Sequence, residues 1–367
     1  MNDSNASQLL ARVMGWKKTA DVQDYVPRLQ LLASLKYDQY QRFGPGRRFV
    51  ENLASWLQQF REEHRLDALK FVLNRVIFLS DAEMSHLVEL AYPDVIVPER
   101  INHVAQEQGI SAHLVRRIVD DTRFTELRLK SLYLGLSDGA RTNELRRASN
   151  GQISNEQIWQ AYELGEEKAK SMTSKLSEAL RNNDLASSDA KFNLVWLLDD
   201  FSGSGNTYIR LDAKTQEFKG KIPRIYERLN QGDLVDQSHY EVFLLLYVAT
   251  RQAIDHIEYW SDRFTSERGY KPLQVRIVLP LEREVAINST NDSAVDALVN
   301  WPDYYDVDAE DEHTRVGGTH VRRGFAGCAL PVVLSHNTPN NSLFVLWGYD
   351  SLKFRGLFPR VSRHGEF

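Results

Sequence analysis

From residue 127 onward, hydrophobic residues gather in short runs instead of long amphipathic stretches. Five runs stand out, within residues 127–136, 193–198, 240–250, 273–281 and 329–335. A short apolar run is typical of a strand buried on both faces of a parallel sheet, and helix-length segments between such strands are typical of an α/β fold. The pattern therefore predicts a mostly parallel sheet flanked by helices.

The first 125 residues have the spacing of helices. Apolar side chains three and four residues apart share one helix face at Phe49, Leu53, Trp56, Leu57 and Phe60. Further along, Ser80 or Asp81 can cap the next helix, and Glu83 is placed to complete a capping box with Ser80. We therefore expect two domains, a helical module over residues 1–125 and an α/β domain over residues 126–367.

Two later segments carry separate predictions. Residues 154–182 are expected to form one long amphipathic helix. Residues 301–320 contain six carboxylates between Asp303 and Glu312, together with glycines. We favour a solvated loop over a metal site for this acidic segment, because the carboxylate spacing is not that of an EF-hand.

Composition narrows the class of protein. The chain has 367 residues, 42% of them hydrophobic, and a net charge of −5 without a strongly basic half, which argues against a bulk nucleic-acid binder. The single cysteine, Cys328, rules out an intrachain disulfide and a cysteine metal cluster, and its apolar neighbours predict a buried thiol. Without a secretory signal or a membrane-length apolar run, we expect a soluble cytoplasmic protein.

The run LVWLLDDFSGSGNT, residues 194–207, sets two carboxylates at the end of a predicted strand. Parallel sheets bind ligands beyond the carboxyl ends of their strands, which is where Asp199 and Asp200 are expected. Ribose hydroxyls can donate hydrogen bonds to such a pair. The alternative is a tight turn in which the aspartates only cap a following helix.

Small residues follow the carboxylates and favour binding of an anion. Gly203, Ser204 and Gly205 leave neighbouring backbone N–H groups accessible, and a helix beginning near Thr207 would direct its positive end to the same place. Together with the two aspartates, this arrangement predicts a site for a ribose 5-phosphate.

The segment resembles the phosphoribosyl pyrophosphate (PRPP) loop of type I phosphoribosyltransferases, in which Asp-Asp, three residues and Ser/Thr-Gly-x-Thr follow an apolar strand. More of the chain resembles the PRTase-CE group of bacterial conflict systems, some of which accompany retrons and other anti-phage modules. The blocks YDQYQRFGPGRRFVENLASWL, LGLSDGART, LLDDFSGSGNT and HNTPNNSLFVLW carry this similarity. The resemblance implies ligand contacts from Ser202, Gly203, Ser204, Gly205, Asn206 and Thr207.

A fold of this type implies a second loop, after an earlier strand, for the pyrophosphate of the donor. The sequence Ser-Asp-Gly-Ala-Arg follows the run 127–136 and is suited to that role. Its guanidinium can form a two-pronged contact with a diphosphate. An ordinary β-turn with a surface arginine is the alternative for Ser137, Asp138, Gly139, Ala140 and Arg141.

A third polar loop follows the run 329–335. If that run is a strand of the same sheet, its loop lies at the same edge as the other two. The neutral hydrogen-bonding groups of His336, Asn337 and Asn340 suit a base or an acceptor. Turn formation and a structural histidine are equal alternatives.

The resemblance implies displacement at C1 of the ribose, with Arg141, Asp199 and Asp200 as catalytic residues. Mg²⁺, held by the two aspartates through water, would neutralise the leaving pyrophosphate. Such enzymes usually carry a strand-loop-strand arm between the two phosphate loops, whereas this interval is predicted to be mainly helical. Closure over the site, and hence turnover, is therefore an open question.

Two functions follow from the resemblance. One is a glycosyltransferase of the pentosyltransferase type that acts in anti-phage defence. The other is an inactive sensor of PRPP or a nucleotide that signals to a partner protein or ribonucleoprotein, such as a retron reverse transcriptase with its RNA or another defence protein. The sequence leaves the acceptor, the trigger and the oligomeric state, including a homo-oligomer, open.

Overall fold

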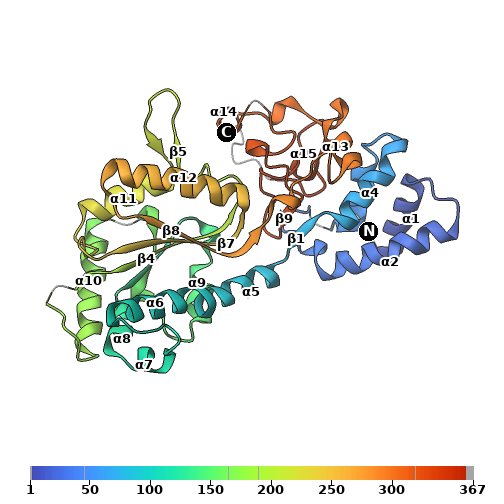
Figure 1. Cartoon of the computed structure of the whole chain (residues 1–367). Helices are drawn as coiled ribbons and strands as arrows, with labels where there is room; N and C mark the ends of the chain where they lie inside the picture. The colour runs from blue at the N-terminus through green and yellow to red at the C-terminus, as the bar shows by residue number, and fades with distance from the viewer. Residues whose placement is uncertain (1, 45, 164, 189, 319, 361–367) are drawn as a thin grey trace. The chain divides into compact units, whose positions relative to one another are not determined.

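The structure is a computed structural model and describes residues 2–44, 46–163, 165–188, 190–318 and 320–360. The chain forms two compact units (Figure 1). One contains the chain up to Met84 together with the chain from Glu282 onward, and the other contains Ser85–Leu281. Each unit has an apolar core of its own. Along the described residues, no helix combines the length and the apolarity needed to cross a membrane.

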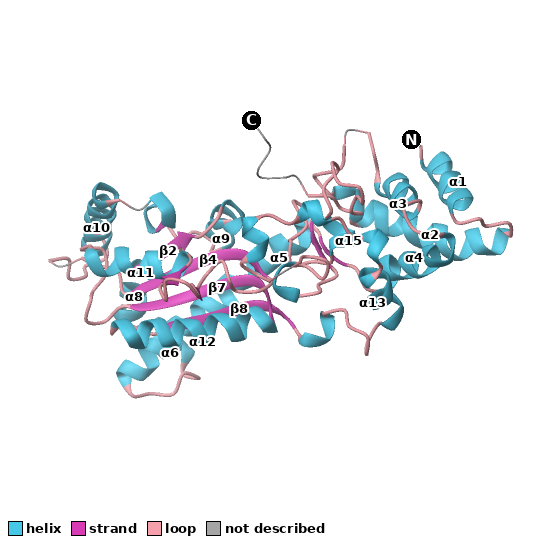
Figure 2. Ribbon diagram, turned by 90° about the horizontal axis from the view of Figure 1, so that it is seen from above, coloured by secondary structure: helices cyan, strands magenta, loops and turns pink. Residues whose placement is uncertain are grey.

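A five-stranded parallel sheet forms the centre of the unit Ser85–Leu281 (Figure 2). Across the sheet the strands are β3 (Ile158–Gln160), β2 (Ser131–Gly135), β4 (Leu194–Ser202), β7 (Glu241–Thr250) and β8 (Leu273–Leu281). In chain order this arrangement is 2-1-3-4-5, a doubly wound sheet whose winding reverses between β2 and β4. The predicted α/β class is confirmed, as are the strands at β2, β4, β7 and β8.

Helices cover both faces of this sheet (Figure 1). On one face, α11 (Lys221–Gln231) and α12 (Arg251–Arg268) bury apolar side chains against the strands. On the other face lie α6 (Val97–Gln108) and α8 (Thr122–Leu129). The unit also contains α7 (Val115–Val119), α9 (Thr142–Ala148), α10 (Glu166–Arg181) and the short hairpin of β5 (Arg210–Leu211) and β6 (Phe218–Lys219).

The prediction of one helix over residues 154–182 is wrong. Only its second part is α-helical, as α10, while β3 occupies Ile158–Gln160 at the edge of the sheet. A buried amide explains the edge strand, because the Gln157 Nε2 donates to the carbonyls of Arg128 at 2.7 Å and Ser131 at 2.9 Å. These bonds hold the segment beside β2.

The run 329–335 also differs from its prediction. It contains a strand, β9 (Val332–Leu334), but β9 pairs in parallel with β1 (Ile77–Leu79) in a separate two-stranded sheet. This pair belongs to the unit that contains both ends of the chain. The loop after β9 therefore does not follow a strand of the five-stranded sheet.

The other unit joins the two ends of the chain around an aromatic cluster. The ring of Phe358 lies 5.2–5.8 Å, centroid to centroid, from five rings, those of Tyr37, Tyr40, Phe43, Phe49 and Phe78. The five residues of the predicted apolar helix face are all buried, but the helix ends at Leu57 and Phe60 follows it in a turn. The helices of this unit are α1 (Asp3–Val13), α2 (Thr19–Leu35), α3 (Phe49–Leu57), α4 (Arg65–Asn74), α13 (Ser293–Asn300), α14 (Glu312–Arg315) and α15 (Phe344–Trp347).

The two compact units are divided differently from the predicted domains, 1–125 and 126–367. The reason is packing, because α1–α4 share a core with segments beyond residue 287, whereas α6 and α8 cover the five-stranded sheet. The helix α5 (Asp81–Ala91) runs across the division at Met84. Its predicted capping box is confirmed, with the Ser80 N–H 2.9 Å from the Glu83 carboxylate and the Glu83 N–H 3.2 Å from the Ser80 hydroxyl.

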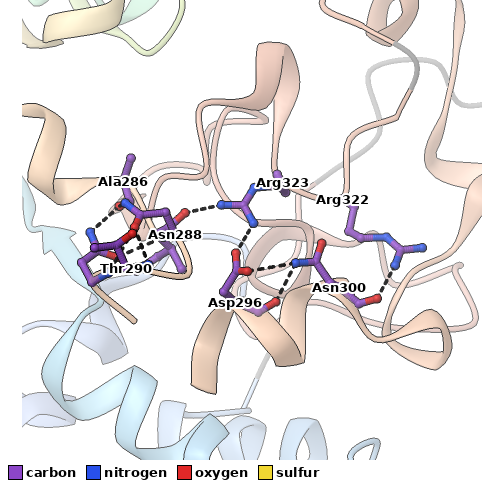
Figure 3. A network of polar contacts seen from close by, with 9 residues as sticks. Ala286, Asn288, Thr290, Asp296, Asn300, Arg322 and Arg323 are labelled. Atoms are coloured by element: carbon purple, nitrogen blue, oxygen red, sulfur yellow. Dashed lines mark hydrogen bonds and ion pairs between the residues drawn. The ribbon is translucent and has the colours of Figure 1, made fainter. Parts of the chain in front are cut away.

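Polar contacts hold the segments after Glu282 together (Figure 3). Arg323 donates to Asp296 of α13 and to the Ile287 carbonyl, and the Arg322 guanidinium donates to the Asn300 carbonyl at 2.6 Å.

The acidic segment 301–320 is a loop with short helical turns, and its carboxylates meet protein groups. Asp303 pairs with Arg61 at 2.8 Å, and Asp306 accepts a hydrogen bond from the Lys353 N–H at 2.7 Å. No group of three His, Cys, Asp or Glu residues in the described part of the chain is placed to hold a metal ion. Cys328 is buried as predicted, and burial raises the pKa of its thiol to about 11.

Candidate functional site

The loops that follow β2 and β4 meet at the point where the sheet reverses its winding. The Leu136 N–H donates to the Leu198 carbonyl at 2.9 Å, so the two strands stay paired up to the start of the loops. Beyond them, a Cβ added to Gly139 would lie 2.5 Å from the Asp200 carboxylate. A larger residue at position 139 would clash with Asp200, so the glycine allows the loops after β2 and β4 to lie side by side. These are two of the three predicted loops. Ligands of doubly wound sheets bind in this crevice.

Asp199 is a buried residue with three protein partners. Its carboxylate accepts hydrogen bonds from the Ser137 hydroxyl, from the Tyr208 hydroxyl at 2.8 Å and from the Lys221 ammonium at 2.7 Å. The Asp199 side chain is 3% exposed and that of Lys221 is 28% exposed. Burial raises the pKa of the Asp199 carboxyl, against the opposing effect of Lys221. Asp199 therefore joins the two loops to α11.

Asp200 is in a different environment. Its side chain is half-buried, next to Gly139, and one carboxylate oxygen accepts the Phe201 N–H at 2.9 Å. The two adjacent aspartates therefore have different protein surroundings. Asp199 holds the loops together, and Asp200 is the carboxylate at the crevice between them.

The loop after β4 presents a run of backbone donors. Among the described residues, no acceptor engages the backbone N–H groups of residues 204–207. Gly205 has φ of +79°, and a Cβ there would lie 2.9 Å from His256 and 3.0 Å from the Ala253 carbonyl of α12. The Thr250 hydroxyl donates to the Gly203 carbonyl at 2.6 Å and fixes the start of the loop. A fixed run of backbone N–H groups without a protein acceptor is a typical binding site for an anion.

The helix expected to begin near Thr207 is not formed there. A turn at Asn206–Tyr208 leads into the β5–β6 hairpin, and α11 begins at Lys221. The side chain of Tyr208 explains the difference, because it turns inward to Asp199 and is 3% exposed. A helix dipole at Thr207 therefore makes no contribution to the site.

The loop after β2 is held in a sharp turn. The Ser137 hydroxyl accepts the Gly139 N–H at 3.2 Å, and the Tyr247 hydroxyl of β7 donates to the Ala140 carbonyl at 3.1 Å. Arg141 has φ of +47°, and its guanidinium contacts both carboxylate oxygens of Glu144 at 3.1 Å. Both of these bonds come from the same guanidinium nitrogen, Nη1, so this contact ties Arg141 to α9, the helix that follows it.

The third predicted loop belongs to the other compact unit. His336, Asn337 and Asn340 belong to the other unit, because β9 pairs with β1. The His336 carbonyl accepts a hydrogen bond from Arg42 at 3.1 Å, and the Asn340 carbonyl accepts one from the Phe325 N–H at 2.7 Å. These contacts are internal ties of that unit.

Three residues of the site were not predicted, namely Tyr208, Lys221 and Tyr247. Lys221 follows Gly220, which has φ of +129° and whose Cβ would lie 2.3 Å from the Tyr208 carbonyl. A Gly-Lys pair 20 residues after the aspartates was the only available signal, and Tyr208 and Tyr247 lie in apolar segments that looked like ordinary core.

The fold and the crevice define a doubly wound α/β protein with a polar site at its switch point. The family model PRTase-CE matches residues 53–360, so the chain belongs to the PRTase-CE family, as the sequence motifs suggested. The match spans both compact units. Neither a curated protein nor a solved structure matches the chain.

Proposed function

We propose that the crevice between the loops after β2 and β4 binds PRPP or a nucleotide with a ribose 5-phosphate. The observation that carries this proposal is the run of backbone N–H groups at residues 204–207 beside the half-buried carboxylate of Asp200. A terminal phosphate suits the N–H groups, and the ribose hydroxyls suit Asp200 as acceptor. The loop Ser137–Arg141 is then next to the pyrophosphate.

The bond chemistry proposed is a substitution at C1 of the ribose. The bond from C1 to the pyrophosphate oxygen breaks, and its electron pair leaves with pyrophosphate. An oxygen or nitrogen of an acceptor forms the new bond to C1, and its proton passes to the solvent or to the pyrophosphate. Asp200 stabilises the positive charge that builds on the sugar in this step. With water as the acceptor, the same step cleaves the donor.

The residues of this site fit an Mg²⁺ ion that binds together with the phosphates of the ligand. The described residues supply no cage of three ligands, but Mg²⁺ typically combines one or two carboxylates with substrate phosphates and water. Asp200, the half-buried carboxylate at the crevice, would hold it through water, and the buried Asp199 already contacts Lys221, Tyr208 and Ser137. The ion would supply neutralisation of the leaving pyrophosphate.

A sensor of the same ligand is the second candidate function. It is favoured by the interval between the two loops, whose described residues contain β3 and α10 and form no two-stranded arm. Without such an arm, closure over the donor needs another element. In either form we place the protein in anti-phage defence, and a reverse transcriptase with its RNA, or another defence protein, is the proposed partner.

Calorimetry with PRPP and Mg²⁺, run beside an assay of pyrophosphate release, tests this proposal. We expect one binding site per chain, lost in Asp200→Asn and kept in Asp233→Asn, an exposed carboxylate of the same unit. Pyrophosphate release with a nucleotide, base or cell extract selects the enzyme. Binding without release selects the sensor, and absence of binding to PRPP and to nucleotides refutes the ligand assignment.

A further inference from the structure

A cavity of about 390 Å³ lies between α6 and the starts of β7 and β8. It is at the edge of the five-stranded sheet where the strands begin, whereas the candidate PRPP site is at the edge where they end. Its lining includes Asn102 and Gln106 of α6, Glu241 and Phe243 of β7, and Pro272 before β8. It lies within the unit Ser85–Leu281, as does the candidate PRPP site. The two sites are at opposite ends of β7, because Tyr247 and Thr250 at its far end hold the two loops.

The charged groups around the cavity are already engaged within the protein. Glu241 accepts hydrogen bonds from His103 at 3.1 Å and Gln274 at 2.7 Å. Arg276 pairs with Glu99 at 2.5 Å, and the Lys271 ammonium donates to a backbone carbonyl at 3.0 Å. Because a charged ligand would need a counter-charge that these pairs have already used, an uncharged ligand fits best.

Two amides remain available on α6. Asn102 and Gln106 are exposed, lie four residues apart on one face of the helix and engage no partner through their side chains in the described part of the chain. Each amide offers donors and an acceptor side by side. The edges of nucleobases carry the same alternation of donors and acceptors.

The apolar part of the lining suits a flat ring. Pro272 is exposed, and Phe243 is buried in a stack with Trp196 at 4.3 Å between ring centroids. Because the Arg276 guanidinium also lies 5.6 Å from the centre of the Phe243 ring, Pro272 is the apolar side chain that the face of a planar ligand would contact. The volume is within the range of small-molecule sites.

We propose that this cavity is a second ligand site and binds a nucleobase, free or as part of a nucleoside. The proposal is independent of the PRPP assignment, because nucleosides lack the phosphate that the loop after β4 would bind. Asn102 and Gln106 recognise the polar edge of the base, and Pro272 contacts its face.

Titration of the full chain with adenosine, guanosine, cytidine and uridine in turn tests the site. At least one nucleoside is expected to bind with a dissociation constant below about 1 mM. Asn102→Leu combined with Gln106→Leu should weaken that binding at least tenfold, since both side chains are exposed and their loss leaves the paired charges intact. Gln23→Leu, an exposed amide on α2, is the matched control and should change nothing.

A second variant, Gln106→Arg, fills the mouth of the cavity with a long cation and should also abolish binding. Asp200→Asn should keep nucleoside binding unchanged even where it abolishes PRPP binding, which separates failure of one proposal from failure of the other. The proposal is overturned if all four nucleosides fail to bind at about 1 mM, or if the amide variants bind as wild type does. In that outcome the amides of Asn102 and Gln106 are ordinary surface groups of α6.

Discussion

Two loops of similar composition follow strands in this chain, yet their polar groups are used in opposite ways. In the loop after β4, the N–H groups of residues 204–207 engage no acceptor among the described residues. In the loop after β9, the Ser335 N–H donates to Leu79 at 2.9 Å and the Thr338 hydroxyl donates to the Phe358 carbonyl at 2.8 Å. Small polar residues form a candidate site only where the surrounding structure leaves their donors unused.

The position of each strand explains the difference. β4 is the middle strand of a doubly wound sheet and ends at the switch point, so its loop faces a crevice. β9 is one of two strands that join the chain ends, so its loop is needed to hold them.

Among variants of the two loops, Asp200→Asn is expected to have the largest effect on PRPP affinity. The variant removes the crevice carboxylate and should weaken PRPP binding at least about 100-fold, which corresponds to about 2.7 kcal/mol. Its melting temperature should stay close to that of wild type, because Asp200 is half-buried at the crevice. Calorimetry and thermal melting measure the two quantities. Wild-type affinity in this variant would mean that the ribose is not at Asp200.

Asp199→Asn should act mainly on stability. It leaves Lys221 without its carboxylate and Tyr208 beside a neutral amide, at an expected cost of about 2 kcal/mol in the free energy of unfolding. Denaturant unfolding measures this cost. Lys221→Met in the same background should recover part of the lost stability, since it removes the unpaired ammonium. A fully stable single variant would contradict the tie between loops and α11.

Gly139→Ala should weaken PRPP binding by less than Asp200→Asn does, and it should leave the stability of the protein nearly unchanged. The new Cβ would lie 2.5 Å from the Asp200 carboxylate, so that side chain must move out of the crevice. We expect about tenfold weaker PRPP binding, or about 1.4 kcal/mol, with little loss of stability. Gly165→Ala, where a Cβ has open space, is the control. Equal affinities of the two variants would show that Asp200 is not needed in its present place.

The smallest effect is expected from the loop after β9. His336→Ala combined with Asn340→Ala should change PRPP affinity by less than about twofold, because the carbonyls of both residues accept hydrogen bonds from their own unit. The same calorimetric titration decides this point. A tenfold loss would show that these residues belong to the ligand site.

The sequence was most informative where a feature is local. The strands β2, β4, β7 and β8 are continuous apolar runs, and the capping box of α5 needs only two residues three positions apart. β3 was missed because three residues with a buried glutamine before them look like the start of an amphipathic helix. The partner of β9 was missed because it is another three-residue strand, some 250 positions earlier in a helical region.

The candidate site shows the same limit. The two loops after β2 and β4 could be singled out from their own residues, and their meeting at the sheet edge followed from the fold. The separation of roles between Asp199 and Asp200 could not, because it depends on Tyr208 and Lys221, which reach Asp199 only after the hairpin and α11 are in place.

The aromatic cluster around Phe358 has a consequence for synthesis of the chain on the ribosome. The rings from Tyr37 to Phe78 leave the ribosome about 280 residues before the ring that completes their core. At about 5–20 residues per second, these apolar surfaces wait for roughly 15–60 seconds. The unit Ser85–Leu281, whose core is contiguous in the chain, emerges whole within that interval. The nascent protein thus carries its finished sheet beside an unfinished N-terminal half-core, which a chaperone can bind until the last segment arrives.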